Sequence, residues 1–257
     1  MENQNNQNDT IIDNIKDKLF EQQFQAVKSF AFDQQVTDVF ADMIKRSVPG
    51  YDSILKSIAM FCMQYAQKDS NIYDLGCSLG AVAVTAAMAT QDKACHVIGV
   101  DTSAPMLEKC QSIIKSKQLG HRIELLKQDI VSMDITNASV VVSNFTLQFI
   151  PKEQRLSVIK NIYDGLKPGG VFILSEKFKG DDESDEFLIK HYHAYKKLNG
   201  YSNKEIQRKR KALVDVLVPD SIIDIEKRLK TVGYEKVLKW FQCFNFASFI
   251  AVKGDVK

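Results

Sequence analysis

Short apolar runs alternate with longer amphipathic segments from about residue 71 onward. The apolar runs, which are rich in β-branched residues, lie at 71–77, 95–101, 123–130, 139–145 and 170–178. Runs that are apolar at successive positions are typical of strands covered on both faces. Helical periodicity occurs between them near 80–91, 104–117 and 152–166. The alternation predicts an α/β fold with a parallel sheet and right-handed crossovers.

Further elements flank this core on both sides. Two late apolar runs, 236–242 and 244–253, are joined by almost no intervening sequence, and this spacing predicts an antiparallel hairpin that closes one edge of the sheet. Before the sheet, residues 35–68 show the pattern of two helices separated at 47–51.

A long helical insertion precedes the hairpin. It covers about residues 181–232 and is interrupted at 199–202 and at 218–221. Because no linker divides the chain, we expect a single catalytic domain over residues 26–257. Residues 1–25 are interpreted as a polar N-terminal tail.

Composition restricts the classes of protein to which the chain can belong. Of 257 residues, 45% are apolar and 26% are charged, which is ordinary for a soluble globular protein. No apolar run approaches the roughly 18 residues of a membrane helix, and the polar N-terminus does not resemble a secretory signal. The net charge, 34 − 32 = +2, is small for a protein that binds many phosphates. We therefore expect neither a membrane protein nor stable nucleic-acid binding.

The cysteines indicate the compartment. There are five, which is an odd number, and they are widely spaced without a C-x-x-C pair. This pattern argues against a disulfide framework and against a structural zinc site, and it favours a reducing compartment. We expect a cytoplasmic protein without a metal.

The first two predicted strands end in residues suited to a nucleoside. The first ends in Asp74-Leu75-Gly76-Cys77-Ser78-Leu79-Gly80, where glycines let a ligand approach the backbone at the N-terminus of the next helix. The second ends in Asp101, whose carboxylate can accept both ribose hydroxyls. Each feature alone is more often structural, because a lone acid after a strand is usually a helix cap.

Two more strand ends strengthen this interpretation. The third carries Asp129 and Ile130, where a carboxylate beside an exposed N–H can read an adenine edge, and the fourth ends in Asn144. Ligands of open α/β sheets bind at such carboxyl ends. With the later Leu166-Lys167-Pro168-Gly169-Gly170, these motifs resemble the S-adenosylmethionine-dependent methyltransferase superfamily over residues 71–178. The resemblance implies a Rossmann-like, seven-stranded, mostly parallel sheet with an antiparallel final strand.

A basic run in the insertion, Arg208-Lys209-Arg210-Lys211, carries a second signal. Successive helical residues turn by about 100°, so four consecutive cations cannot share one face. The nearby apolar positions are Ile206, Leu213, Val214 and Leu217. Arg210 falls within their stripe, so we expect it to face the interior or a pocket, with Arg208 and Lys211 pointing away. A buried guanidinium needs an anion, either an internal carboxylate or that of a ligand.

Longer strings narrow the resemblance to one family. They are Arg46-Ser47-Val48-Pro49-Gly50-Tyr51, Tyr73 through Gly80, Asn144-Phe145-Thr146-Leu147-Gln148-Phe149, Leu174-Ser175-Glu176-Lys177-Phe178, Asn199-Gly200-Tyr201-Ser202, Lys209-Arg210 and Trp240-Phe241-Gln242-Cys243-Phe244-Asn245-Phe246. From about residue 31 to its end, the chain resembles the carboxy-S-adenosyl-L-methionine synthase family. Residues 1–25 lie outside the resemblance.

The resemblance implies an activity and a set of site residues. The family converts S-adenosyl-L-methionine and prephenate to carboxy-S-adenosyl-L-methionine and phenylpyruvate, and it is usually homodimeric. A separate tRNA carboxymethyltransferase uses the product to modify a wobble uridine. By resemblance, Arg210 holds the new carboxylate. The full set of nucleotide-binding residues by resemblance is Tyr51, Gly76, Cys77, Ser78, Asp101, Thr102, Asp129, Ile130, Asn144 and Arg210.

Several alternatives stay open at this level. His193, Tyr201 and Lys177 are candidates for prephenate contacts, but each could equally have a packing or surface role. No general base, catalytic cysteine pair or metal cluster is apparent in the sequence. The chain could instead be a methyltransferase acting on a small molecule or tRNA, or a non-catalytic binding partner of a tRNA-modifying enzyme.

Overall fold

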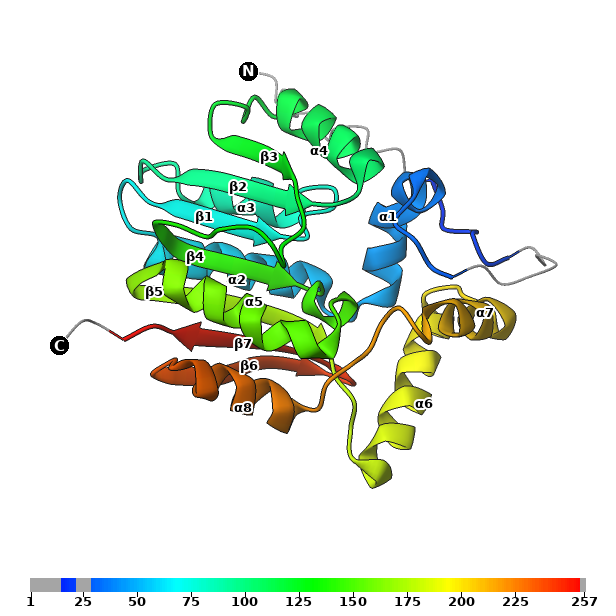
Figure 1. Cartoon of the computed structure of the whole chain (residues 1–257). Coiled ribbons are helices and arrows are strands. Elements are labelled where there is room, and N and C mark those ends of the chain that lie inside the picture. Colours follow the sequence, from blue (N-terminus) through cyan, green and yellow to red (C-terminus); the bar gives the residue numbers. More distant parts are fainter. Residues whose placement is uncertain (1–14, 22–28, 255–257) are drawn as a thin grey trace, which may run out of the picture.

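A seven-stranded sheet forms the centre of the protein in a computed structural model that describes residues 15–21 and 29–254 (Figure 1). The strand order is β3-β2-β1-β4-β5-β7-β6. The strands are β1 (Asn71–Leu75), β2 (His96–Asp101), β3 (Ile123–Lys127), β4 (Ala138–Asn144), β5 (Leu166–Lys177), β6 (Lys236–Cys243) and β7 (Phe246–Val252). Strands β1 to β5 pair in parallel, and β7 is antiparallel to both of its neighbours. The predicted fold class is confirmed, including the late hairpin.

The order of the strands determines where a ligand can bind. The chain builds the sheet outward from β1 to β3 and then returns to place β4 on the other side of β1. The carboxyl ends of β1 and β4 therefore flank a point where the connections diverge. Open α/β sheets bind ligands in the crevice at such a point.

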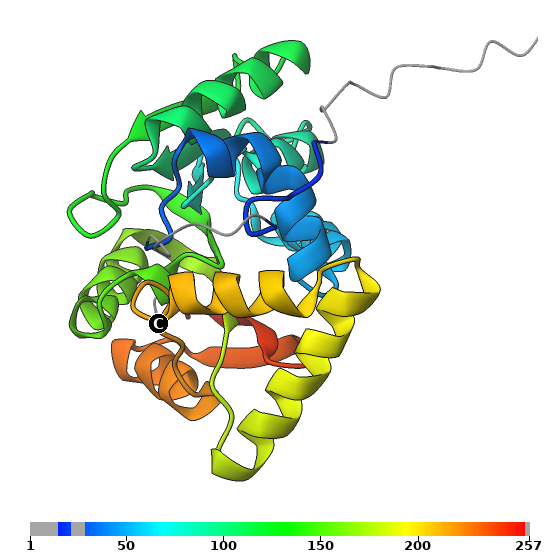
Figure 2. The same ribbon diagram turned by 90° about the vertical axis from the view of Figure 1, so that its right-hand side faces the viewer.

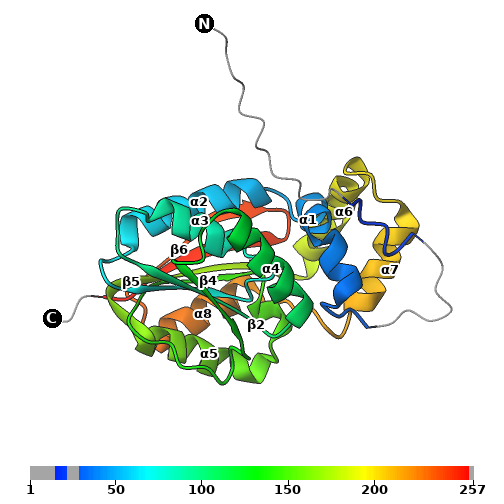
Figure 3. The same ribbon diagram turned by 90° about the horizontal axis from the view of Figure 1, so that it is seen from above.

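Helices cover both faces of the sheet (Figure 3). On one face lie α2 (Tyr51–Tyr65), α3 (Ala81–Ala89) and α4 (Ala104–Ser116), whose apolar residues share a buried core with β1, β2 and β4. On the other face lie α5 (Lys152–Gly165) and α8 (Ile222–Val232), which pack on a second core. The double cover explains why the strands are apolar at successive positions.

Three more helices cap the carboxyl ends of the parallel strands (Figures 1 and 2). They are α1 (Gln34–Ser47), α6 (Asp182–Leu198) and α7 (Asn203–Leu213), and a short 3₁₀ helix, η1 (Leu147–Phe149), lies beneath them. Arg46 joins α1 to the turn between α6 and α7, because its Nε donates to the Asn199 carbonyl at 2.7 Å. The predicted break at 199–202 lies between α6 and α7, and the one at 218–221 directly precedes α8, whereas α7 already ends at Leu213.

Residues 15–21 differ from the tail interpretation. Asp17 is only 1% exposed, and its carboxylate accepts a hydrogen bond of 2.6 Å from the Tyr201 hydroxyl. This segment therefore packs against the capping helices. The remainder of the predicted tail, residues 1–14 and 22–25, lies outside the described residues. Across the described ranges, no helix is long and apolar enough to cross a membrane.

A buried cluster of charged side chains holds the end of the insertion beside the sheet. Asp220 follows α7, and its backbone carbonyl accepts from the N–H of Lys179, just past β5, at 2.9 Å. The Asp220 carboxylate is 2.6 Å from Arg155 Nη1 and 2.9 Å from Arg228 Nη1. Although burial alone would raise the pKa of Asp220, the hydrogen bonds from these two arginines lower it below the ordinary carboxylate value.

We expect Asp220→Asn to destabilise the fold by about 3–5 kcal/mol, because it leaves the buried Arg155 without its counter-charge. Urea unfolding at neutral pH measures the change. Since folding lowers the pKa of Asp220, its contribution is present above the unfolded-state pKa and fades as the pH falls through the carboxylate range. Exposed Asp215 provides the matched control, Asp215→Asn, and equal stability of the two variants would refute the assignment.

Candidate active site

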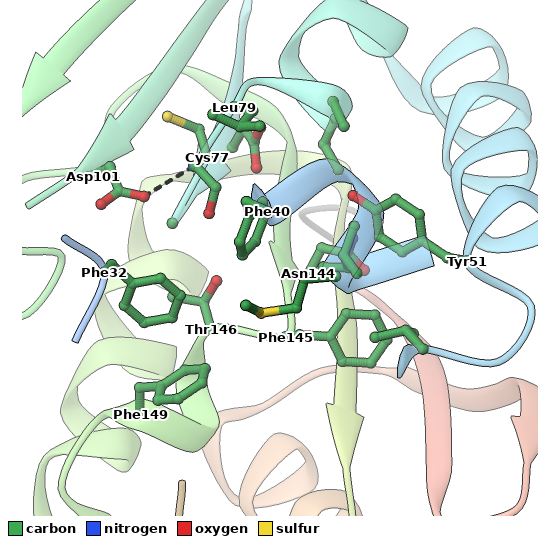
Figure 4. Close-up of a pocket in the computed structure, with 18 of the residues that line it drawn as sticks. Phe32, Phe40, Tyr51, Cys77, Leu79, Asp101, Asn144, Phe145, Thr146 and Phe149 are labelled. Atoms are coloured by element: carbon green, nitrogen blue, oxygen red, sulfur yellow. Dashed lines mark hydrogen bonds between the residues drawn. The ribbon is translucent and has the colours of Figure 1, made fainter. Parts of the chain in front are cut away.

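A cavity of about 600 Å³ opens at the carboxyl ends of β1, β2 and β4, beneath the capping helices. Figure 4 shows part of its lining. The lining includes nine of the ten residues predicted to bind the nucleotide, namely Tyr51, Gly76, Cys77, Ser78, Asp101, Thr102, Asp129, Ile130 and Asn144. The structure thus brings these residues to one place, and their individual binding roles stay predictions.

The loop between β1 and α3 is held in an unusual backbone conformation. Gly76 has φ of 77°, and a Cβ at this position would collide with the Thr146 side chain, so no other residue fits without rearrangement. Ser78 also has a positive φ, of 48°, and its N–H donates to Asp101 Oδ2 at 2.9 Å (Figure 4). A non-glycine residue in this region stores strain, which is commonly found at binding sites.

Asp101 links two loops that border the cavity. While Oδ2 accepts from Ser78, its Oδ1 accepts from the N–H of Ser103 at the start of α4, also at 2.9 Å. A carboxylate has about four acceptor positions, so two remain for ribose hydroxyls. The arrangement fits the predicted role and fixes the direction of the side chain.

Asp74 has a structural role in this site. It is 2% exposed, and its carboxylate accepts from the N–H of Ala83 in the first turn of α3 at 2.9 Å. Burial raises the pKa of Asp74 to about 7. This is the helix-cap explanation that the sequence left open for an acid at a strand end.

Two polar groups in the cavity have no protein partner. Among the described residues, the N–H of Ile130 has no acceptor, and it lies next to the Asp129 carboxylate. The buried Oδ1 of Asn144 likewise lacks a donor within the described part of the chain. Buried polar atoms are usually satisfied, so such atoms in a cavity indicate a ligand. A nucleoside with an adenine edge and an attached ammonium group offers the matching donors and acceptors.

Aromatic rings close one side of the cavity (Figure 4). Phe32 contacts Phe40 of α1 and Phe149 of η1, with ring centroids 6.3 and 5.2 Å apart. The segment that carries Phe32 is fixed at both sides, because Ser103 Oγ donates to the Phe32 carbonyl and the Phe30 N–H donates to the Ala212 carbonyl. These contacts hold Phe32 in the wall of the cavity.

Two lysines also lie in the cavity wall. Lys177, at the end of β5, and Lys209 of α7 both line the cavity. Burial, reinforced by the charge of Arg210, lowers the pKa of Lys177 to about 8. Burial also lowers the pKa of Lys209 to about 8, although the nearby Asp17 opposes the shift. Lys177 is a predicted candidate contact, whereas Lys209 is not.

The predicted orientation of Arg210 is wrong. Arg210 is exposed and does not line the cavity, whereas Lys209 is 7% exposed and faces inward. The prediction assumed that the helix continues through Val214 and Leu217, but α7 ends at Leu213 and Val214 is 61% exposed. The inward stripe is Ile206, Lys209 and Ala212. Arg210 still lies close enough to Lys177 and His193 to lower their pKa values.

The other candidate contacts for prephenate are placed differently. Tyr201 is 5% exposed and its hydroxyl already donates to Asp17, so it packs beside the lysines instead of contacting the ligand. His193 is half-buried outside the cavity lining, next to Tyr192, with ring centroids 6.0 Å apart. Burial and the charge of Lys196 lower the pKa of His193, which makes it a neutral neighbour of the cavity.

Comparisons with known proteins agree with this geometry. A family model described as a methyltransferase domain matches residues 72–170. Human N-acetylserotonin methyltransferase in complex with S-adenosylmethionine superposes with a TM-score of 0.60 at 15% identity, covering 86% of this chain and 55% of that chain. Magnesium protoporphyrin IX methyltransferase from Synechocystis gives a TM-score of 0.58 at 16% identity, covering 82% and 87%. The fold is that of the S-adenosylmethionine-dependent methyltransferases.

Closer relatives define the family. A Photobacterium profundum protein named carboxy-S-adenosyl-L-methionine synthase is 46% identical over 239 residues, or 93% of this chain and 98% of that protein. A Vibrio cholerae protein of the same name is 44% identical over 241 residues, or 93% and 98%. The chain belongs to the carboxy-S-adenosyl-L-methionine synthase family.

We expect Asp101→Ala to weaken the binding of S-adenosylmethionine and of its carboxylated form by the same amount. The expected loss is roughly 1.5–3 kcal/mol, the range for hydrogen bonds to a charged group. Titration calorimetry with each nucleotide measures this. The exposed Asp92→Asn is the control. A loss confined to one of the two nucleotides would contradict a role at the ribose, which both share.

Proposed function

We propose that the protein converts S-adenosyl-L-methionine and prephenate to carboxy-S-adenosyl-L-methionine and phenylpyruvate. The observation that carries the proposal is a nucleoside cavity with cationic side chains, Lys177 and Lys209, in its wall. An ordinary methyl transfer does not require positive charge beside a sulfonium, whereas attaching a carboxylate to the methyl carbon does. The names of the relatives support the same product.

The chemistry needs little acid–base machinery from the protein. The sulfonium makes its methyl protons weakly acidic, because it stabilises the ylide that remains after deprotonation. Prephenate loses its ring carboxylate as CO2 and its ring hydroxyl as hydroxide, which leaves the aromatic ring of phenylpyruvate. The hydroxide takes one methyl proton to form water, and the ylide carbon then attacks CO2 to give the carboxymethyl sulfonium.

The protein's contribution is position, charge and exclusion of water. The wall around Phe32 and Phe149 limits the escape of CO2 and the access of water to the ylide. The lysines stabilise the carboxylates of the acid and of the product. Arg210, whose charge lowers the pKa of Lys177, is proposed from the family resemblance to hold the new carboxylate.

We further propose a homodimer in the cytoplasm that binds no nucleic acid stably and passes its product to a tRNA carboxymethyltransferase. Exposed Met60 and Met63 on α2 and Leu238 on β6 offer an apolar surface for a second copy. The ring of Phe61 on α2 lies 5.3 Å from that of Trp240 on β6, which makes the two elements neighbours. The five free thiols fit a reducing compartment.

Incubation of the purified protein with S-adenosylmethionine and prephenate should give two products, phenylpyruvate and a nucleotide heavier by one CO2. Liquid chromatography with mass spectrometry detects both. Omission of prephenate is the control and should leave S-adenosylmethionine unchanged. Formation of S-adenosylhomocysteine on an added acceptor, with no carboxylated nucleotide, would instead establish methyl transfer.

Replacing Arg210 with Leu should preserve the affinity for S-adenosylmethionine. It should weaken the binding of carboxy-S-adenosylmethionine by roughly 1.5–3 kcal/mol, the range for a hydrogen bond to a charged group. Calorimetry with the two nucleotides measures the difference. The neighbouring Lys211→Leu controls for loss of surface charge on the same helix. If Arg210→Leu retains the carboxylated nucleotide as well as this control does, Arg210 has no role in holding the carboxylate.

A further inference from the structure

A cluster of ammonium groups lies where α6 and α7 meet the end of β5, and we name Lys177, Lys196 and Lys209 the lysine cluster. Lys196 and Lys209 are 4% and 7% exposed, and Lys177 is half-buried in the cavity wall. Burial of several like charges is unfavourable unless anions compensate them. The three ammonium groups of the cluster therefore need compensating negative charge.

Two tyrosines separate the three ammonium groups. Lys177 Nζ lies 5.1 Å and Lys196 Nζ 5.7 Å from the ring centroid of Tyr192. Tyr201 lies on the other side of Lys196, at 5.0 Å. Contacts of a cation with a ring face stabilise the charge in part but do not neutralise it.

Within the described residues, the cluster forms one ion pair with a carboxylate. Asp17 Oδ2 is 3.9 Å from Lys209 Nζ, and the same oxygen already accepts the Tyr201 hydroxyl. Among the described residues, neither Lys177 Nζ nor Lys196 Nζ makes a hydrogen bond or an ion pair. Burial together with the charges of Lys209 and Lys177 lowers the pKa of Lys196 to about 7.

We propose that Lys177 and Lys209 bind the carboxylates of the second substrate, a dicarboxylic acid, and that Lys196 and Asp17 position the two lysines. The site rests on the proposed function, because it assumes that this acid enters beside the sulfonium. Lys177 and Lys209 reach it from different elements, β5 and α7, and both line the cavity that Asn144 and Tyr51 share. Lys196 raises the positive potential of the site without lining it. Asp17 orients Lys209 and opposes the lowering of its pKa by burial.

The test uses binding without turnover. S-Adenosylhomocysteine lacks the methyl group, so its complex with the protein can bind prephenate but cannot react. Calorimetry of prephenate into this complex should show roughly 10–100-fold weaker binding for Lys177→Met and for Lys209→Met, as expected for loss of one charged hydrogen bond. The affinity of each variant for S-adenosylhomocysteine should stay within about twofold of the wild type. A twofold change is small beside a tenfold change, which corresponds to about 1.4 kcal/mol. Lys211→Met, exposed on the same helix, should match the wild type.

The pH dependence separates direct contact from a structural role. Lys177 faces the cations Arg210 and Lys196, the weakly basic His193, and Asp185, whereas Lys209 faces Asp17, Asp42, Arg46 and Lys196. A bound anion favours the charged form of each lysine. The affinity for prephenate is therefore highest below the pKa of about 8 that the lysines have without prephenate, and it falls as the pH rises above this value. Lys177→Arg should reduce this fall, because a guanidinium stays charged.

Each outcome decides one claim. Unchanged prephenate affinity in both Lys→Met variants, or no prephenate binding to the wild-type complex, would overturn the lysine site. Turnover by the wild type in the same preparation would leave the proposed function intact in either case. Conversely, lysine-dependent binding of prephenate without formation of a carboxylated nucleotide would support the site and refute the proposed function.

Discussion

Positive charge held out of water is the constraint on which this structure depends. A sulfonium is itself a cation, and a site that only binds it would favour carboxylates nearby. Here ammonium groups of Lys177 and Lys209 line the same cavity, and the caps α6 and α7 hold them there. Burial lowers the pKa values of both lysines to about 8, so a carboxylate of the second substrate would favour their charged forms, which ties the architecture to the reaction.

The scaffold beneath the cavity serves this arrangement. The carboxyl ends of β1, β2 and β4 supply Gly76, Asp101 and Asn144 at the point where the sheet connections diverge. Asp220, at the end of the segment that follows α7, binds the Lys179 N–H just past β5 and forms salt bridges with Arg155 and Arg228. These contacts hold the end of the insertion beside the sheet.

The sequence alone predicts the sheet and the nucleoside half of the site well. β-Branched runs and glycine turns are local signals, and the strand-end positions follow from topology, which explains why nine nucleotide-contact candidates meet at one cavity. The charged half is harder, because helical phase is reliable only while the helix continues. α7 ends at Leu213, so apolar residues beyond it misled the placement of Arg210. Asp17 could not be found from local pattern, since its partner Tyr201 is 184 residues away.

We propose that a carboxyl group moves from the acid to the methyl carbon within this cavity. The most direct measurement supplies prephenate whose ring carboxylate carries a heavy carbon isotope and follows the label by mass spectrometry of the nucleotide product. We predict that the label appears in the carboxymethyl group attached to sulfur, even when unlabelled bicarbonate is present in excess. A carboxylated nucleotide without the label, or no such nucleotide at all, would contradict the account.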